Sequence, residues 1–327
     1  MEFGRDKRTK SYLITGATGY IGSMLVKHIR ETDREARITA LVRDREKAKS
    51  VLPDGASVLA ADLTDRAAVR QLEVSCDYLI HCASVTRSAE MVSHPVEAVE
   101  SIVNATQNVL ELARRCGVQS MAYLSSMEVY GALDCGKNRL ASENEAAQGA
   151  VELLEARSCY PLGKRMAENL CYCYYKEYGL PVKIARLAQT FGSGILPGEN
   201  RVFAQFARAA REGRDIVLHT RGESVGNYCG IRDAIKGILL ILEKGENGQA
   251  YNVVNESNTM TIREMAELVA EKIAPKKIRV VCDIPEDNPY GYARDTGLRL
   301  SGRKLRGLGW TPAQGMEEMY LELMGEL

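Results

Sequence analysis

The sequence predicts an α/β fold with a doubly wound parallel sheet, and three observations support this prediction. Short apolar runs alternate with longer segments of helical periodicity through the first 190 residues. A glycine-rich turn, Gly16 to Gly22, joins the first apolar run to the first helical segment. Apolar residues make up 45% of the 327-residue chain and charged residues 26%, which is typical of a globular protein with one large or two packed domains.

Each predicted strand of the first part is followed by a predicted helix. The strands are 11–15, 38–42, 57–61, 77–82, 119–125 and 181–187, and the main helices are 23–30, 66–74, 94–116 and 160–178. Asp65 is expected to cap the second helix, and Gly117 and Gly179 are expected to end the last two. This alternation places helices on both faces of one parallel sheet.

The regular alternation of predicted strands and helices ends after residue 187, and we predict a domain boundary near residue 190. Residues 192–200 are rich in glycine and proline. The later predicted helices are 201–213, 233–244 and 262–273, and the later predicted strands are 215–219 and 250–254. Thr261 and Glu264 have the spacing of a capping box at the start of the last helix. Residues 191–327 should therefore form a smaller α/β domain, with some segments returning to the sheet.

Charge and cysteine usage argue against several classes of protein. The chain has 43 lysine and arginine residues and 43 aspartate and glutamate residues, so its net charge is zero. It therefore has no excess of positive charge that would indicate binding to nucleic acid or an anionic membrane. No apolar run approaches the roughly 20 residues that span a bilayer, and the N-terminus is too polar for a secretory signal. The nine cysteines are irregularly spaced without C-x-x-C, and the four histidines show no metal-ligand spacing. We expect a cytoplasmic protein with reduced thiols and no metal site.

The turn Gly16-x-x-Gly19-x-x-Gly22 has the spacing of a dinucleotide-binding motif. The first glycine permits a tight turn, the second lets the backbone approach a pyrophosphate, and the third lets helix and strand pack closely. The turn follows a predicted strand and opens a predicted helix, which is the context that such a motif requires. A dinucleotide cofactor is therefore expected in the domain of residues 1–190.

The residue that ends the second strand indicates which dinucleotide binds. An acidic side chain at this place bonds the ribose 2′-hydroxyl of NAD, whereas an arginine accommodates the 2′-phosphate of NADP. The position falls on Arg43, which favours NADP. Asp44 would serve NAD if the strand ended one residue later, so NAD stays the alternative.

Tyr160 and Lys164 lie one helical turn apart on one face of a predicted helix. A neighbouring ammonium group stabilises phenolate and lowers the pKa of a tyrosine from about 10 towards neutral pH. Tyr160 is therefore a candidate general base for a hydroxyl, or general acid for a ketone. Tyr172 and Lys176 repeat this spacing, but Tyr160 opens its helix downstream of a strand that ends in Ser125 and Ser126. In a doubly wound fold, such a strand end faces the ligand crevice.

These motifs and others along almost the whole chain resemble the extended short-chain dehydrogenase/reductases. Within that class the chain is most similar to the NAD(P)-dependent nucleotide-sugar epimerase/dehydratase group, which implies a Rossmann sheet and a mainly substrate-binding C-terminal domain. The matching segments are Gly16–Gly22 (GATGYIG), Asp62-Leu63, His81-Cys82-Ala83, Ser125–Gly131 (SSMEVYG), Tyr160–Lys164, Arg186–Gly192 (RLAQTFG), Tyr251-Asn252-Val253 and Leu308–Pro312 (LGWTP).

The resemblance implies a role for each matching residue. Tyr160 would be the acid/base, Lys164 would bind the nicotinamide ribose, and Ser126 would bond the reacting hydroxyl. The implied cofactor contacts are Gly16, Gly19, Tyr20, Ile21, Gly22, Arg43, Asp62, Leu63, Ala83, Tyr160 and Lys164. The implied reaction removes the proton of a sugar hydroxyl, usually at C4, while hydride passes to the nicotinamide. Pairing of the two long helices, 94–116 and 160–178, with their copies would make a homodimer.

Three departures from the family pattern bear on the reaction. The 4,6-dehydratases have an acidic pair after the serine, and Met127 replaces its first member, which disfavours dehydration although Glu128 remains as a catalytic candidate. Sugar-acid decarboxylases are similar around RLAQTFG and retain the glutamate, but Gly226 occupies the place of an arginine that they need. Gln189 replaces the usual asparagine before T-[YF]-G.

A nucleotide-sugar epimerase is the function that we expect from the sequence. The candidate substrate ligands are Gln189, Arg201 and Arg294, with Arg221 and Arg232 as further arginines that could replace the missing one. Four alternatives stay open: an NADPH-dependent reductase of a ketone or aldehyde, a decarboxylase or a dehydratase with a compensated site, and a dinucleotide-sensing scaffold.

Overall fold

The computed structural model describes residues 9–285 and 295–326, which divide into two compact units. The first unit contains the chain up to Ser125, Leu153–Ile184 and Ile241–Gln249. The second unit contains Ser126–Glu152, Ala185–Leu240 and the chain from Ala250 onward. A boundary was expected near residue 190, and the chain passes between the units at Ala185; the grouping of residues 126–152 with later segments was not predicted. Each unit is described by itself.

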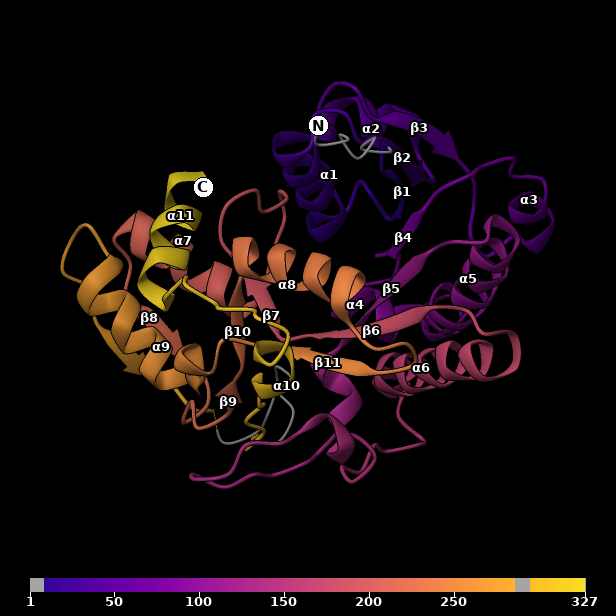
Figure 1. Ribbon diagram of the computed structural model, residues 1–327. Coiled ribbons are helices and arrows are strands. Elements are labelled where there is room, and N and C mark those ends of the chain that lie inside the picture. The colour runs from indigo at the N-terminus through magenta and orange to yellow at the C-terminus, as the bar shows by residue number, and fades with distance from the viewer. Residues whose placement is uncertain (1–8, 286–294, 327) are drawn as a thin grey trace, which may run out of the picture. The chain divides into compact units, whose positions relative to one another are not determined.

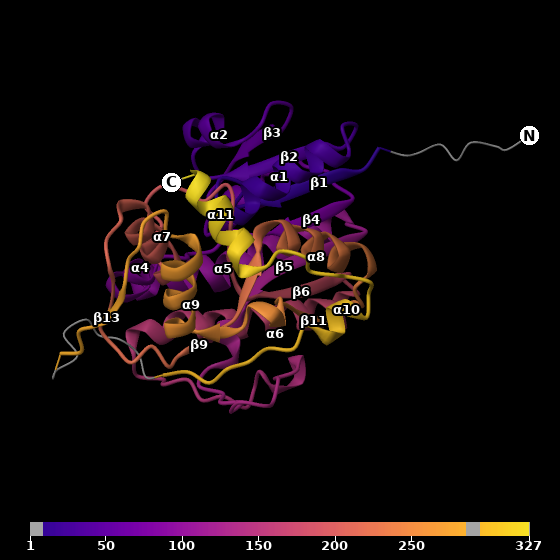
Figure 2. The same cartoon turned by 90° about the vertical axis from the view of Figure 1, so that its left-hand side faces the viewer.

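A seven-stranded sheet confirms the predicted fold class. Its strands are β1 (Ser11–Thr15), β2 (Arg37–Val42), β3 (Ser57–Ala60), β4 (Tyr78–His81), β5 (Ser120–Ser126), β6 (Val182–Leu187) and β11 (Ala250–Val253). The order is β11-β6-β5-β4-β1-β2-β3, and β1 to β6 can be followed in Figure 2. The pairs among β1 to β5 are parallel, with Ile14 opposite both Ala40 and Ile80. The order reverses between β1 and β4, which is where doubly wound folds bind ligands.

The helices of the first unit are α1 (Tyr20–Thr32), α2 (Arg45–Val51), α3 (Arg66–Arg70), α4 (Ser88–Ser93), α5 (Pro95–Cys116) and α6 (Cys159–Tyr178). Four of them, α1, α3, α5 and α6, were predicted, whereas α2 and α4 were not. The long helices α5 and α6 pack against each other, as Figure 1 shows. Gly117 and Gly179 end them with positive φ angles of 61° and 69°, which only glycine adopts at little cost.

Helix α3 is shorter than predicted because two of its last carbonyl oxygens are bound from outside the helix. Asp65 caps its start by accepting hydrogen bonds from the amides of residues 67 and 68, as expected. At the other end, the Arg115 guanidinium donates to the carbonyl oxygens of Val69 and Arg70 at 2.8 and 2.9 Å. The helix therefore ends at Arg70 rather than at Val74.

The second unit consists of short strand pairs and helices. The strand pairs are β7 (Gln189–Phe191) with β10 (Tyr228–Gly230), β9 (Val225–Gly226) with β12 (Met260–Thr261), and β8 (Ile216–Leu218) with β13 (Val280–Cys282). The helices are α7 (Val202–Glu212), α8 (Ile231–Lys244, whose last residues lie in the first unit), α9 (Ile262–Leu268), α10 (Arg303–Arg306) and α11 (Met316–Glu326). The capping box of Thr261 and Glu264 forms as predicted, and a π-helical turn, η5 (Val269–Ile273), continues α9.

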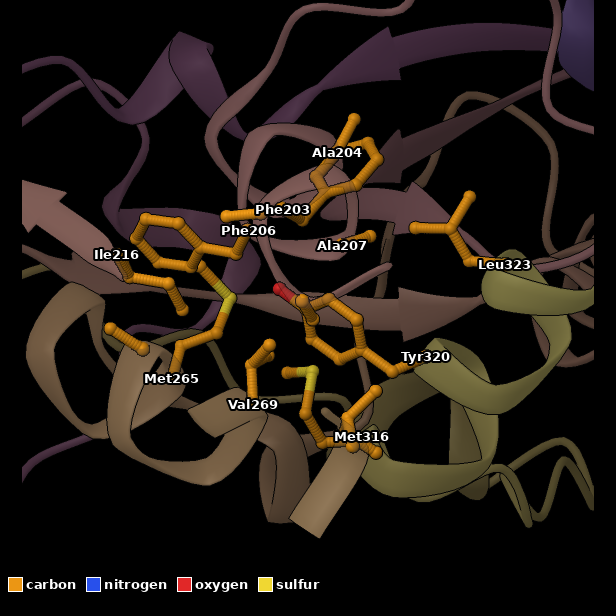
Figure 3. Close-up of a cluster of buried hydrophobic side chains, with 14 of the residues drawn as sticks. Phe203, Ala204, Phe206, Ala207, Ile216, Met265, Val269, Met316, Tyr320 and Leu323 are labelled. Atoms are coloured by element: carbon orange, nitrogen blue, oxygen red, sulfur yellow. The ribbon is translucent and has the colours of Figure 1, made fainter. Parts of the chain in front are cut away.

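An aromatic cluster forms the core of the second unit. Phe203 from α7 and Phe191 from β7 stack with ring centroids 4.3 Å apart, and Tyr320 from α11 meets Phe191 edge-on at 5.2 Å. Figure 3 shows side chains of α7, α9 and α11 pointing into this cluster, with Met265 and Val269 on one side. Burial of these side chains, each of which removes apolar area from water, holds the helices of this unit together.

Candidate active site

The glycine turn of the first unit has the geometry that a dinucleotide pyrophosphate requires. Gly16 has a φ of 65°, and a Cβ added there would lie 2.6 Å from the amide nitrogen of Ala83. A Cβ at Gly22 would overlap the carbonyl oxygen of Gly16. The N-cap of α1 is Gly19, which has no side chain that could cap the first helical turn, where Tyr20 and Ile21 lie. Such a helix start is an anion-binding site.

A hydroxyl beside this turn also fits a bound cofactor. The amide of Ala83 donates to the hydroxyl oxygen of Thr15 at 3.3 Å, which holds the end of β4 against the end of β1. The next residue, Ser84, has a buried hydroxyl oxygen that lacks a hydrogen-bond partner within the described chain. Buried polar atoms normally have a partner, so this hydroxyl is suited to bind a ligand next to Ala83.

At the end of β2, Asp44 and Arg43 are the two candidates to contact the adenosine ribose of the cofactor, and their surroundings differ. Asp44 is the N-cap of α2, and its carboxylate accepts from the amides of Glu46 and Lys47 at 2.8 and 3.1 Å. Arg43 is exposed directly after β2. Hydrogen bonds from the backbone and side chain of Thr64, and then the charge of Arg43, hold the pKa of Asp62 below its usual range. Leu63, beside it, is buried.

His81 supports the strand ends and stays neutral. One ring nitrogen lies 2.7 Å from the Thr15 hydroxyl, and the other lies 3.2 Å from the Thr106 hydroxyl. Burial, followed by the nearby charge of Lys164, lowers the pKa of His81 to about 3. A neutral, buried imidazole bonded to two hydroxyl groups serves packing rather than acid/base chemistry.

Tyr160 and Lys164 lie in the first turns of α6, and both are buried. The Lys164 ammonium nitrogen is 5.8 Å from the centroid of the Tyr160 ring and 4.9 Å from that of Tyr123. It donates a hydrogen bond to the carbonyl oxygen of Leu124 at 2.9 Å. The structure therefore brings together the tyrosine and lysine that the sequence singled out, and fixes the lysine to the end of β5.

The sequence analysis missed Glu168, which lies one turn after Lys164 on α6. Its carboxylate accepts a hydrogen bond from the Ser125 hydroxyl at 2.5 Å, and the glutamate is only 9% exposed. Lys164 and Glu168 thus bind consecutive residues of β5, Leu124 and Ser125. The spacing of four residues in α6 was the available signal, because i and i+4 share one helix face.

Ser126 and Glu128 belong to the second unit. The Ser126 hydroxyl oxygen accepts from the amide of Glu128 at 3.2 Å, which makes Ser126 the N-cap of the short 3₁₀ helix Met127–Tyr130. Both side chains are partly exposed. Their catalytic roles stay predictions.

A cluster of buried polar side chains lies at the end of this short helix, and it was not predicted from the sequence. The Tyr130 hydroxyl donates to the side-chain oxygen of Asn252 at 2.8 Å, and Arg186 donates to the Tyr130 hydroxyl at 3.3 Å and to the Glu143 carbonyl oxygen at 2.7 Å. Burial raises the pKa of Tyr130 to about 12, so its phenol stays protonated. Tyr130 and Arg186 lie within the matching segments SSMEVYG and RLAQTFG, and these bonds hold the end of the 3₁₀ helix within this unit.

The predicted substrate ligands have different surroundings. Gln189 begins β7, and its amide nitrogen donates to the carbonyl oxygen of Asn227 at 2.9 Å. Arg201 is exposed, bound to the Glu199 carboxylate and stacked on the Phe203 ring. Arg294 lies outside the described residues. Substrate binding by these three residues stays a prediction.

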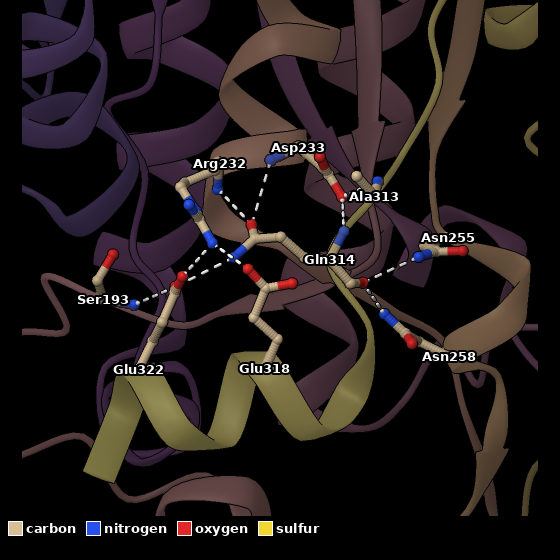
Figure 4. A network of polar contacts seen from close by, with 9 residues as sticks. All are labelled: Ser193, Arg232, Asp233, Asn255, Asn258, Ala313, Gln314, Glu318 and Glu322. Atoms are coloured by element: carbon tan, nitrogen blue, oxygen red, sulfur yellow. Dashed lines mark hydrogen bonds and ion pairs between the residues drawn. The ribbon is translucent and has the colours of Figure 1, made fainter. Parts of the chain in front are cut away.

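The surroundings of Arg232 and Gly226 show whether an arginine is available to replace the one that decarboxylases have at position 226. Arg232 pairs with the carboxylates of Glu318 and Glu322 on α11, and its amide donates to the Gln314 side chain at 2.9 Å (Figure 4). This arginine therefore fixes the C-terminal helix. A Cβ at Gly226 would overlap the hydroxyl of Tyr228, so the tyrosine occupies the space that a larger side chain would need.

Asp233 is also part of this network, and its bonds give the segment LGWTP a structural role. Its carboxylate accepts from the amides of Ala313 and Gln314, both at 2.7 Å, and its carbonyl oxygen accepts from the Trp310 indole at 3.0 Å. The Gln314 carbonyl oxygen in turn accepts from Asn255 and Asn258, as Figure 4 shows. The segment therefore serves the architecture of the second unit.

The described residues contain no group of three or more side chains arranged to hold a metal ion. No helix among them is both long enough and apolar enough to cross a membrane.

Comparison with known proteins assigns the family. A model described as "NAD dependent epimerase/dehydratase family" matches residues 12–255. The chain belongs to this family. It is an enzyme of a class that depends on NAD, as the resemblance implied, and the glycine turn, the glycine-capped start of α1 and the Ser84 hydroxyl fit such a cofactor.

Relatives and solved structures of several activities are similar to the chain. It is 28% identical over 319 residues to UDP-glucuronic acid decarboxylase 6 of Arabidopsis thaliana, covering 96% of this chain and 87% of that one. It is 27% identical to UDP-glucuronic acid decarboxylase 1 of Danio rerio, covering 97% and 72%. The structure of UDP-glucose 4-epimerase from Thermotoga maritima matches with a TM-score of 0.80 at 22% identity, covering 97% and 98% of the two chains. The Thermus thermophilus UDP-glucose 4-epimerase complex with NAD matches with a TM-score of 0.77 at 25% identity, covering 97% and 98%.

Proposed function

We propose that this enzyme oxidises a hydroxyl of a nucleotide-linked sugar and that its best candidate substrate is a nucleotide-linked hexuronic acid, which it decarboxylates. The observation on which the proposal depends is the buried pair on α6, with the Lys164 ammonium 5.8 Å from the Tyr160 ring and fixed to Leu124. A phenol beside a buried cation is suited to accept the proton of an alcohol.

The chain's own residues have separate tasks in this reaction. Lys164 favours the phenolate of Tyr160, and Tyr160 removes the proton from the sugar hydroxyl and later returns it. Ser126 would hydrogen-bond the same hydroxyl. The glycine turn and the first turn of α1 would hold the cofactor pyrophosphate, with Ser84 as a further donor. The nicotinamide supplies the hydride acceptor for this alcohol oxidation.

Decarboxylation follows from the chemistry of the oxidised sugar. A ketone at C4 makes the carboxylate on C5 the acid group of a β-keto acid, which loses carbon dioxide readily because the ketone stabilises the resulting carbanion. The two relatives compared above are named UDP-glucuronic acid decarboxylases, and Glu128 is retained here. These points favour decarboxylation over the epimerisation that we expected from the sequence.

Epimerisation is the second candidate, and one observation favours it. Tyr228 occupies the space beside Gly226, so the arginine that the sequence comparison with sugar-acid decarboxylases calls for has no room at that position. An enzyme without this arginine would bind its substrate through other groups, and a neutral sugar would then be reoriented and reduced on its other face.

One incubation distinguishes these reactions. Purified protein is incubated with UDP-glucuronic acid and UDP-glucose, each with NAD or NADP, while the product mass and nicotinamide absorbance are followed. Loss of carbon dioxide from UDP-glucuronic acid supports the proposal. A new isomer of unchanged mass indicates an epimerase, and stoichiometric oxidation of NADPH in a parallel incubation with a ketone indicates a reductase. Turnover of neither sugar nucleotide would contradict the nucleotide-sugar assignment.

We propose NADP as the preferred cofactor. Asp44 already accepts two backbone hydrogen bonds at the start of α2, whereas Arg43 is exposed at the end of β2. An arginine at this position suits a 2′-phosphate, and a carboxylate used as a helix cap is less available to a ribose hydroxyl.

We also propose a homodimer in the cytoplasm. Helices α5 and α6 and the segment before α6 carry exposed apolar side chains, Val96 at 70%, Leu154 at 96% and Met166 at 52% exposure. The apolar groove lined by Pro95, Val99 and Leu162 lies in the same region. A second copy would cover this self-complementary face. All nine cysteines are free thiols, which suits a reducing compartment.

The oligomer has a direct test. Light scattering on the purified chain should give twice 36.1 kDa, and Val96→Glu should halve the measured mass. Lys27→Glu, an exposed change on α1, is the matched control and should leave the mass unchanged. A monomeric wild-type chain would contradict this proposal.

A further inference from the structure

Two cysteines that are far apart in the sequence lie on neighbouring segments of the first unit. Cys76 lies in the loop before β4 and Cys116 is the last residue of α5, whose thiol reaches that loop. Both are free thiols, and each perturbs the pKa of the other. Cys76 is 6% exposed, whereas Cys116 is partly exposed. The active site uses neither residue.

The backbone around both cysteines keeps the thiols together. The Cys116 thiol donates to the carbonyl oxygen of Val74 at 3.1 Å, two residues before Cys76. Three residues after Cys116, Gln119 donates to Asp77 twice, from its backbone amide to the carbonyl oxygen and from its side chain to the carboxylate, both at 2.8 Å. The end of α5 is thus fixed to the loop that contains Cys76.

The charges around the pair give the two sulfurs different character. The hydrogen bond from Cys76, and then the charge of Arg115, lower the pKa of the Cys116 thiol, against the opposing effect of burial. The hydrogen bond to Cys116, burial and the negative charge of Asp77 raise the pKa of Cys76. Arg115 is held in place by the carbonyl oxygens of α3. Cys116 therefore has the thiolate character that oxidants attack, and Cys76 stays a protonated neighbour.

We propose that Cys76 and Cys116 form a peroxide-reactive dithiol that closes a reversible disulfide. The Cys116 thiolate attacks one oxygen of hydrogen peroxide, the O–O bond breaks, and hydroxide leaves and takes up a proton to form water. The Cys76 thiol then attacks the sulfenic sulfur of Cys116, an S–S bond forms, and a second water leaves with the thiol proton. Two thiols are oxidised and one hydrogen peroxide is reduced to two waters.

The position of the pair predicts what the disulfide does. Cys76 precedes the start of β4, whereas the predicted cofactor contact Ala83 and the buried Ser84 hydroxyl follow the other end of that strand. The disulfide should therefore leave cofactor binding unchanged. It would link two segments separated by β4, α4 and α5, which restricts the unfolded chain and should raise the melting temperature by about 3 °C or more.

Peptide mapping of the whole chain tests the proposal. The reduced protein is treated with one equivalent of hydrogen peroxide, alkylated and digested without reductant, and Cys76 and Cys116 peptides should appear linked, with the link removed by dithiothreitol. In Cys76→Ser, dimedone should trap a sulfenic acid on Cys116. In Cys116→Ser, Cys76 should stay alkylatable. Cys173→Ser, an exposed position on α6, is the matched control and should still form the link.

Each remaining outcome would overturn the proposal. If Cys173 or Cys282 is oxidised while Cys116 stays alkylatable, Cys116 is not the reactive thiol. If Cys116 proceeds to sulfinic acid with Cys76 unlinked, the pair does not close. The wild-type map decides both points even if a serine variant fails to fold, and activity on any substrate is not needed.

Discussion

The Lys164 ammonium donates a hydrogen bond to the carbonyl oxygen of Leu124 at 2.9 Å, which fixes the cation of α6 to the end of β5. The cation then lies 5.8 Å from the Tyr160 ring on the same helix. Without this bond, a long flexible lysine side chain would have many rotamers, and only some would place the charge beside the phenol. The bond to Leu124 therefore holds the cation where it can lower the pKa of the Tyr160 phenol, as we propose.

Removal of the Lys164 charge should slow the reaction and shift its pH profile. Lys164→Met keeps most of the side-chain volume but removes the cation, so kcat should fall roughly 100-fold and the acidic limb of the profile, which reports deprotonation of Tyr160, should move to higher pH. Lys183→Met is the matched control, because Lys183 is also a buried lysine whose ammonium binds Ser120 and Pro181. Equal losses in both variants would show that the effect is structural.

The bond between Ser125 and Glu168 should stabilise the end of β5. Glu168→Ala leaves the buried Ser125 hydroxyl without its acceptor, and we expect the free energy of unfolding to fall by about 1–3 kcal/mol in urea titrations. Ser125→Ala should cost less, and the double variant should be less destabilised than the sum of the two by about 1 kcal/mol. Strict additivity would mean that the two side chains do not interact.

His81 should make the protein less stable in acid. Its pKa of about 3 in the folded state lies below the ordinary value near 6.5, so between these values the unfolded chain binds a proton that the folded chain does not. The free energy of unfolding should therefore fall by about 1.4 kcal/mol per pH unit below about pH 6.5, from this residue alone.

A histidine variant isolates this contribution. His81→Gln should lower stability at neutral pH yet reduce the slope of the free energy of unfolding between about pH 6 and 4. The exposed His94→Gln should keep the wild-type slope. An unchanged slope in His81→Gln would contradict a neutral, buried His81.

Arg43 should determine the cofactor preference. Arg43→Ala removes the guanidinium beside the end of β2, and we expect NADP to bind about tenfold or more weakly while NAD binding is nearly unchanged. Arg45→Ala, in the first turn of α2, is the control and should change neither affinity by more than about twofold. If both cofactors weaken equally in Arg43→Ala, the arginine does not read the 2′-phosphate.

Local sequence signals were sufficient for most of the fold. Strand β1, the cap at Asp65, the capping box of Thr261 and Glu264, and the glycines that end α5 and α6 depend on neighbours within a few residues, and all were predicted. Element ends that depend on distant partners were less predictable. Helix α3 stops early because Arg115, on another helix, binds its last carbonyl oxygens.

The candidate site was predictable where a motif determines chemistry and unpredictable where tertiary contacts do. The spacing of Tyr160 and Lys164 was readable, but the bonds from α6 to Leu124 and Ser125 join residues about 40 positions apart in the chain. Arg232 is the opposite case. From the sequence it was a candidate to replace the arginine missing at Gly226, whereas its ion pairs with Glu318 and Glu322 depend on how α11 packs.

The most direct test of the account is the turnover of Tyr160→Phe, measured as carbon dioxide released from UDP-glucuronic acid with NAD or NADP supplied. The substitution removes one oxygen atom from a buried ring, so folding and cofactor binding should persist. We predict that kcat falls by about 100-fold or more, since no other group would take the proton. A variant that binds cofactor normally and keeps kcat within about threefold of wild type would contradict the assignment of Tyr160 as the base.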